Sequence, residues 1–253
     1  MIKYLGLPAL ASEHGRDVDN LILFVHFLMG ALFLGWIIYF IYVLLRFRAP
    51  KTPRADYVGT KSHASSWIEW AVIVVEGVLL FGLSIPLWAK FADKFPEESK
   101  SVVMRVVAQQ FAWNAVYAGA DGKFAKQDLH LISSTNTLGF DPQDPAGKDD
   151  VQVLNDLYAV VNKPVIAHIS SKDVVHSFKI NSFRVTQDAI PGLSIPTYFT
   201  PTKEGTFLIA CAQLCGNSHA FMRGFFHVVS QEKFDAWMAE NAKKVGGAGA
   251  SYE

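Results

Sequence analysis

Two long apolar runs dominate the first third of the chain. Residues Leu21–Leu45 contain no Asp, Glu, Lys or Arg, and His26 is their only histidine. The second run, Ile68–Trp88, carries Glu69 at its start and Glu76 inside it. At about 1.5 Å of rise per residue, each run is long enough as a helix to cross a hydrocarbon layer of about 30 Å. Buried core helices are the alternative, but the pattern favours a two-helix transmembrane hairpin.

From about Phe95 onward the pattern changes to short β-type runs separated by turn residues. The predicted strands are Val102–Val107, Leu157–Val161, Val165–Ser170, Ser177–Ile180, Gly205–Ala210 and Phe225–Val229. Ala118–Asp150 is rich in Gly, Asp, Pro and Ser, and we expect a long loop or insertion with one short strand near Leu129. The spacing of apolar residues predicts a helix over Gln231–Lys244. The fold class is therefore all-β, a sandwich or barrel behind a membrane anchor.

The charges in the link between the apolar runs predict the topology. This link carries Arg46, Arg48, Lys51, Arg54 and Lys61, and short basic loops stay on the cytoplasmic side. Both ends of the hairpin then lie outside. We expect an external N-terminal tail over 1–20, which lacks the pattern of a signal peptide. A hairpin over 21–94 follows, with helices at about 21–46 and 68–88. An external domain over 95–245 and a frayed end over 246–253 complete the chain.

Composition excludes one class of partner. The chain has 23 basic and 23 acidic residues, so its formal net charge is zero. A nucleic-acid partner would need a basic excess, and none is expected. The hydrophobic residues that make up 51% of the chain point instead to the lipid bilayer.

The segment from Cys211 to Met222 carries the strongest chemical signal. It reads Cys211-Ala-Gln-Leu-Cys215-Gly-Asn-Ser-His219-Ala-Phe-Met222 and contains the only two cysteines of the chain. Two thiolates, an imidazole and a thioether form a soft ligand set that selects copper over hard cations. Because a predicted strand lies on each side of the segment, the ligands would be held with little freedom to reorganise.

Three other interpretations compete with copper. Cys211 and Cys215 could form a disulfide, or they could bind structural zinc together with histidines. Met222 could simply fill the core, the usual role of methionine. The combined spacing of the four residues favours the copper site.

A further ligand is expected from outside this segment, and His176 is the best candidate. It follows the apolar run Val165–Ile169 and precedes the predicted strand Ser177–Ile180. His168 and His227 lie inside predicted strands, so a structural role is expected for both.

These features resemble subunit II of the haem–copper cytochrome c oxidases. The matching motifs are Asn162-Lys-Pro164, Asp173-Val-Val-His-Ser-Phe178, Asp188-Ala-Ile-Pro-Gly192 and the Cys211–Met222 segment. Together with the two-helix anchor they cover essentially the whole chain. The resemblance implies a cupredoxin-like Greek-key β-sandwich or barrel outside a bacterial-type cytoplasmic (inner) membrane.

The resemblance also implies a dinuclear copper centre, CuA. Its ligands would be the bridging Cys211 and Cys215, His176 and Met222 on one ion, and His219 and the backbone carbonyl of Gln213 on the other. Electrons would come from cytochrome c or a membrane-bound haem c donor. They would pass to haem in subunit I, which also carries CuB and reduces oxygen to water. Subunit III is a further expected partner of this proton-pumping complex, and no catalytic residue is expected in this chain.

Two positions depart from the family pattern. Gln213 stands where the family usually has a Glu whose carboxylate binds an interface magnesium ion. A neutral amide is a weaker ligand for a hard cation, so the magnesium site is doubtful here. In the aromatic segment that accepts electrons, Phe111 holds the first position and Trp113 the second, although either ring could equally belong to the core.

Glu69 and Glu76 form a candidate proton entry. The family has a Glu near the cytoplasmic end of its second helix, and Glu69 fits this position best. Glu76 lies seven residues on and shares the same helix face. Ionisable residues in membrane helices usually face the protein interior and are functional, although a hydrogen bond to a partner subunit is the plain alternative.

Other function classes fit less well. A membrane-anchored copper carrier or metallochaperone would use fewer and more exposed ligands. A quinol oxidase subunit II would lack the two cysteines, and a nitrous oxide reductase would lack the two-helix anchor.

Overall fold

The structure, a computed structural model, describes residues 6–48, 51, 57–59, 61–133 and 135–245. The chain divides into a helical unit, which contains residues 17–90, and a β unit, which contains residues 3–16 and everything from Phe91 onward. Arg54 of the basic link and the expected frayed end over 246–253 lie outside the described residues.

Both predicted transmembrane helices are present in the helical unit. Helix α1, Gly15–Arg46, begins before the expected start at residue 21, so the tail predicted over 1–20 is helical from Gly15 onward. The second helix runs through α2, Ala64–Gly77, the π-helical stretch η2, Val78–Ser84, and α3, Ile85–Ala92. The two helices have 32 and 29 residues, and their most apolar stretches are unburied in the chain. Each is therefore long and apolar enough to cross a membrane.

Pro86 accounts for the π-helical stretch. A proline has no backbone N–H and its ring clashes with the preceding turn, so the regular hydrogen bonding has to shift just before it. Ser84, the last residue of η2, donates its hydroxyl to the carbonyl of Leu79 at 3.0 Å. The helix passes the proline by widening one turn, and it remains continuous to Ala92.

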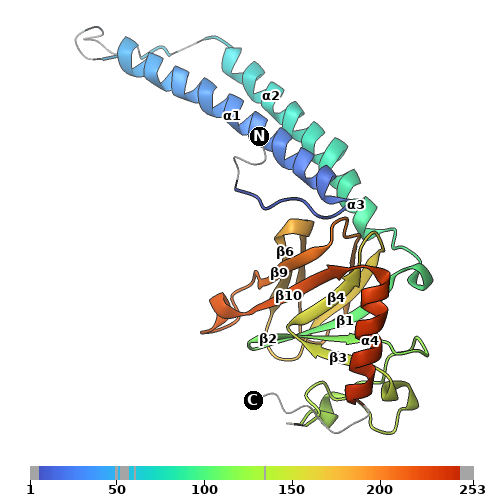
Figure 1. The fold of residues 1–253 in the computed structure, drawn as a ribbon. Coiled ribbons are helices and arrows are strands. Elements are labelled where there is room, and N and C mark those ends of the chain that lie inside the picture. The colour runs from blue at the N-terminus through green and yellow to red at the C-terminus, as the bar shows by residue number, and fades with distance from the viewer. Residues whose placement is uncertain (1–5, 49–50, 52–56, 60, 134, 246–253) are drawn as a thin grey trace. The chain divides into compact units, whose positions relative to one another are not determined.

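The β unit is a sandwich of two sheets (Figure 1). Its strands are β1 Val102–Gln109, β2 Ala112–Tyr117, β3 Val151–Leu154, β4 Asp156–Val160, β5 Val165–Ser171, β6 His176–Ile180, β7 Val185–Ala189, β8 Ile195–Phe199, β9 Gly205–Cys211 and β10 Arg223–Val229, followed by helix α4, Gln231–Val245. One sheet has the order β3-β2-β1-β5-β8 and the other β4-β10-β9-β6-β7. Each sheet has one parallel pair, β1 with β5 in the first and β10 with β4 in the second, and its other pairs are antiparallel.

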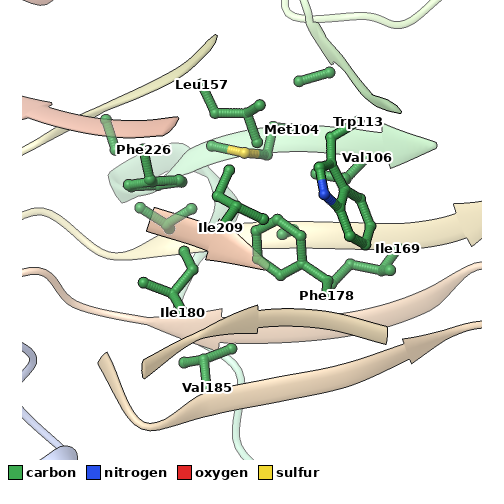
Figure 2. Close-up of a cluster of buried hydrophobic side chains, with 14 of the residues drawn as sticks. Met104, Val106, Trp113, Leu157, Ile169, Phe178, Ile180, Val185, Ile209 and Phe226 are labelled. Atoms are coloured by element: carbon green, nitrogen blue, oxygen red, sulfur yellow. The ribbon is translucent and has the colours of Figure 1, made fainter. Parts of the chain in front are cut away.

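The two sheets bury a mainly apolar core between them (Figure 2). Alternate residues of β1, including Met104 and Val106, point inward and are fully buried. Trp113 meets Phe178 edge-on, with ring centroids 5.4 Å apart, so the two sheets touch through aromatic side chains. Burying each such large side chain contributes roughly 1.5–3 kcal/mol to folding.

Each predicted strand and the C-terminal helix are confirmed, with ends shifted by at most a few residues. The prediction of a strand near Leu129 is wrong, because Leu129–Leu131 forms a 3-10 turn.

Four strands of the sandwich were not predicted. Three of them, β3, β7 and β8, are sheet edges. Edge strands tolerate proline and polar residues, so their alternation is weak. The fourth, β2, is buried at every position and shows no alternation at all.

The segment before α1 packs on the β unit. The Ala11 N–H donates to the carbonyl of Ser182, and the Thr202 N–H donates to the carbonyl of Ala11, both at 2.8 Å. The buried hydroxyl of Ser12 donates to the carbonyl of Phe183 at 2.7 Å. These bonds attach the expected external tail to the sandwich.

Candidate metal centre

Neighbouring strands bring the predicted ligands to one end of the sandwich. His176 opens β6, Cys211 closes β9, and Met222 directly precedes β10. In the β6–β9 register, Phe178 lies opposite Cys211. The Cys211 N–H donates to the carbonyl of Met222 at 3.3 Å, which closes the loop between β9 and β10.

The donor atoms of all six predicted ligand residues gather within this loop and beside it. The two thiol sulfurs lie 3.7 Å apart. Cys211 Sγ lies 3.8 Å from His176 Nδ1 and 3.1 Å from the Gln213 carbonyl oxygen. Cys215 Sγ lies 3.5 Å from His219 Nδ1 and 3.8 Å from Met222 Sδ. A metal pair could therefore be bound here without moving the backbone far.

The centre lies at the boundary between the core and the surface. His176 is fully buried, and Cys215 and Met222 belong to the core cluster. Burial, followed by the neighbouring thiol of Cys211, raises the pKa of Cys215 to about 11. A metal would have to displace this proton, because only the thiolate is a strong ligand.

Asp173 orients the His176 ring. One carboxylate oxygen accepts a hydrogen bond from His176 Nε2 at 2.8 Å, which leaves Nδ1 directed at Cys211. Burial alone would raise the pKa of Asp173, but hydrogen bonds from the Gln110 N–H, His176 and the Val174 N–H lower it below its usual value. A carboxylate behind a ligating histidine holds the ring and increases its basicity.

Gln110 connects the two ligand segments. Its backbone N–H donates to Asp173 at 2.7 Å, and its side-chain amide donates to the Cys215 carbonyl at 2.6 Å. The turn between β1 and β2 thereby links the residue behind His176 to the loop that carries Cys215. The sequence indicated neither role, although Asp173 opens one of the motifs that resemble the family.

Both candidate aromatic residues lie beside the centre. Trp113 is fully buried, and its ring is 6.2 Å from that of His176, measured between centroids. Phe111 is half-buried against Gly216, where an added Cβ would come within 3.1 Å of the Phe111 ring. Gly216 also has a φ of +140°, which L side chains rarely adopt, so this position requires glycine. Trp113 is thus part of the core as well as a neighbour of a ligand.

Two of the interpretations that compete with copper, a disulfide and a methionine that only fills the core, agree poorly with the geometry. The cysteines are free, and their sulfur separation of 3.7 Å is far from the bond length of about 2.05 Å in a disulfide. Met222 is buried, yet its sulfur faces that of Cys215 at 3.8 Å instead of only filling space. Two thiols, two imidazoles, a thioether and a carbonyl fit a soft metal such as copper.

Glu69 and Glu76 lie elsewhere, on α2 of the helical unit. Both side chains are exposed in the chain by itself. Seven residues make nearly two helical turns, so both carboxyl groups share one face of the helix.

Comparison with known proteins identifies the family to which this chain belongs. The model of the family described as Cytochrome C oxidase subunit II, periplasmic domain, matches residues 102–229, from the first strand to the last. The chain belongs to the cytochrome c oxidase subunit II family. Its two apolar helices and its periplasmic-type domain make it a membrane-anchored member with an external cupredoxin-like domain.

Relatives in this family extend the similarity beyond the β unit. The alternative cytochrome c oxidase subunit 2 of Bradyrhizobium diazoefficiens is 30% identical over 92% of this chain and 83% of its own length. Cytochrome c oxidase subunit 2 of Cereibacter sphaeroides is 30% identical over 68% of this chain and 59% of its own length. The crystal structure of the periplasmic domain of subunit II of cytochrome oxidase from Bradyrhizobium japonicum aligns with 28% identity and a TM-score of 0.45, covering 60% of this chain and 99% of that one.

If the centre binds copper, removing the Gln110 side chain should weaken that binding. We expect Gln110→Ala to release copper to a chelator about two- to tenfold faster, the effect of losing one hydrogen bond worth about 0.5–1.5 kcal/mol. The rate can be followed by the loss of the copper absorbance in the full chain. Gln152→Ala, at an exposed position of β3, is the matched control. Equal release rates in the two variants would show that the link is not needed.

Proposed function

We propose that this chain is the electron-transfer subunit of a terminal respiratory oxidase and holds a dinuclear copper centre, CuA. The ligands proposed are the side chains of His176, Cys211, Cys215, His219 and Met222 and the backbone carbonyl of Gln213. When bound, the copper pair takes up and gives up one electron at a time. Oxygen is reduced to water in subunit I, which carries haem and CuB, and not in this chain.

The observation that carries the proposal is the convergence of these donors at one hairpin loop and at the start of β6 beside it. The two sulfurs are 3.7 Å apart, and each one has an imidazole nitrogen within 3.8 Å. Strands enter and leave the loop, and Asp173 and Gln110 support it from outside. Ligands held this firmly would change geometry little when the charge on the metal changes, and this favours fast electron transfer.

The partners proposed follow from the family. Cytochrome c or a membrane-bound haem c donor would deliver electrons to the external domain, and subunits I and III would lie beside the helices in the bacterial-type cytoplasmic membrane. The exposed amide of Gln213 replaces the carboxylate of the family, so we do not propose a magnesium ion here.

Copper counting with electron paramagnetic resonance tests the centre. The full chain, purified in detergent, should contain two coppers that share one unpaired electron and give a seven-line hyperfine pattern. Cys215→Ser should abolish this pattern because it removes a proposed bridging thiolate. Asn217→Ala, in the same loop but not at a proposed ligand, should preserve it. One copper per chain, or zinc in its place, would refute the proposal.

Electron entry through the aromatic residues is tested by conservative replacement. We propose that Phe111 and Trp113 lie on the path, because each contacts a residue at the centre or next to it. Phe111→Leu and Trp113→Phe should slow oxidation of the reduced donor in stopped-flow measurements while the copper spectrum stays intact. Phe225→Leu is the control on the outer surface. Unchanged kinetics with an intact centre would remove the substituted residue from the path.

Proton entry through α2 is tested in the assembled oxidase. We propose that Glu69, and with it Glu76 on the same face, feeds protons toward subunit I. Glu69→Gln should lower turnover and proton pumping because an amide cannot release a proton, and Glu76→Gln should have the smaller effect. Glu98→Gln, outside the apolar run, is the control. Normal turnover and pumping in both helix variants would exclude this role.

A further inference from the structure

A polar cleft lies on the face of the β3-β2-β1-β5-β8 sheet that points away from the core. Arg105 of β1 lies opposite His168 of β5 on neighbouring parallel strands. The residues before and after each of them are buried in the sandwich, so these two side chains project outward. Residues of the 118–150 insertion form the other wall. The sequence pattern predicted only a structural role for His168 and did not indicate a cleft here.

The cleft is large enough for a small molecule. Its volume is about 670 Å³, within the range of about 300–1,000 Å³ that is typical of ligand sites. The hydrogen-bond donors that line it are Arg105, Lys126, His168, Ser170, Lys172 and Ser194. They come from two strands, a strand end, a loop and the insertion, so they approach the space from several directions.

Several of these donors have no partner among the residues that the structure describes. Arg105 donates from Nη1 to the Ala125 carbonyl at 3.0 Å and to Gln127 at 3.4 Å, and its guanidinium lies 4.5 Å from the centre of the Phe124 ring. These contacts hold the group in place but leave its Nε and Nη2 donors free within that part of the chain. The half-buried His168 ring is likewise unpaired there. Donors of a cleft that have no protein partner are available to a ligand.

Three basic side chains, those of Arg105, Lys126 and Lys172, line the cleft against two acidic ones. Asp128 and Asp141 also line it, but each uses a carboxylate oxygen to cap a backbone turn, accepting the N–H of His130 at 2.8 Å and of Gln143 at 2.9 Å respectively. Asp150 lies near Arg105 and is fully buried. Burial raises the pKa of Asp150, while the hydrogen bond from the Ala125 N–H and the nearby Arg105 charge oppose this shift.

We propose that this cleft binds a small organic molecule that carries a phosphate group. A tetrahedral phosphate can accept hydrogen bonds from several directions at once, as the converging guanidinium, ammonium, imidazole and hydroxyl donors require. The Phe124 ring, stacked on the guanidinium, offers an apolar surface to the organic part. The cleft shares no residue with the proposed metal centre. Phosphate binding in the cleft can therefore be tested independently of copper binding.

Calorimetric titration of the full chain in detergent tests this site. The probes are inorganic phosphate, glucose 6-phosphate and unphosphorylated glucose, each at the same ionic strength. We expect saturable binding of both phosphate compounds and none of glucose. Tighter binding of the ester would identify an organic phosphate as the ligand class, and tighter binding of inorganic phosphate would overturn that part of the proposal.

Variants that lose the same charge at different positions distinguish specific phosphate binding in the cleft from nonspecific electrostatic attraction to the domain. Lys126→Gln should weaken phosphate binding by about tenfold or more, the effect of losing one charge-assisted hydrogen bond. Lys148→Gln removes the same charge from an exposed position of the same insertion outside the cleft lining and should leave the affinity unchanged. His168→Gln provides a second test from the sheet side. Absence of saturable binding, or equal weakening by the two lysine substitutions, would overturn the proposal.

Discussion

The proposed metal centre depends on the pairing of β6 with β9. Phe178 lies opposite Cys211, so His176, two residues earlier, reaches past the end of β9 into the ligand loop. A shift of one residue would turn His176 to the other face of its strand and away from the thiols. The register is protected because Phe178 is fully buried against Trp113. Packing in the core thereby sets the position of a ligand.

Several residues belong both to the hydrophobic core of the sandwich and to the proposed metal centre or its surroundings. Met222 and Cys215 belong to the apolar cluster and also supply donor atoms, while Trp113 contacts both Phe178 and His176. A side chain packed at the density of a protein interior has little room to move. The rigidity that electron transfer favours therefore comes from the hydrophobic core itself, and Gln110 and Asp173 add polar links only at its open end.

The sandwich divides its roles between different surfaces. One end carries the soft donors of the proposed copper centre, where the apolar core meets the loop. The outward face of one sheet carries the basic cleft formed with the 118–150 insertion. Arg105 belongs to the same strand as the buried Met104 and Val106, so a single strand builds the core with one face and the cleft with the other.

Features that depend on local pattern can be predicted from the amino-acid sequence. The two membrane helices follow from long apolar runs, the predicted strands from short β-branched and aromatic runs, and the Cys211–Met222 ligand segment from its spacing. Edge strands such as β8, with Pro196 inside it, escaped prediction because their partners and not their own residues stabilise them.

Contacts between residues far apart in the chain become visible only in the folded structure. The link from Gln110 to both Cys215 and Asp173 joins positions far apart in the chain, as does the pairing of Arg105 with His168. Such contacts arise from strand order and register, which no local pattern records. For the same reason, the sequence indicates the donor types of the proposed metal centre but not the residues that orient those donors.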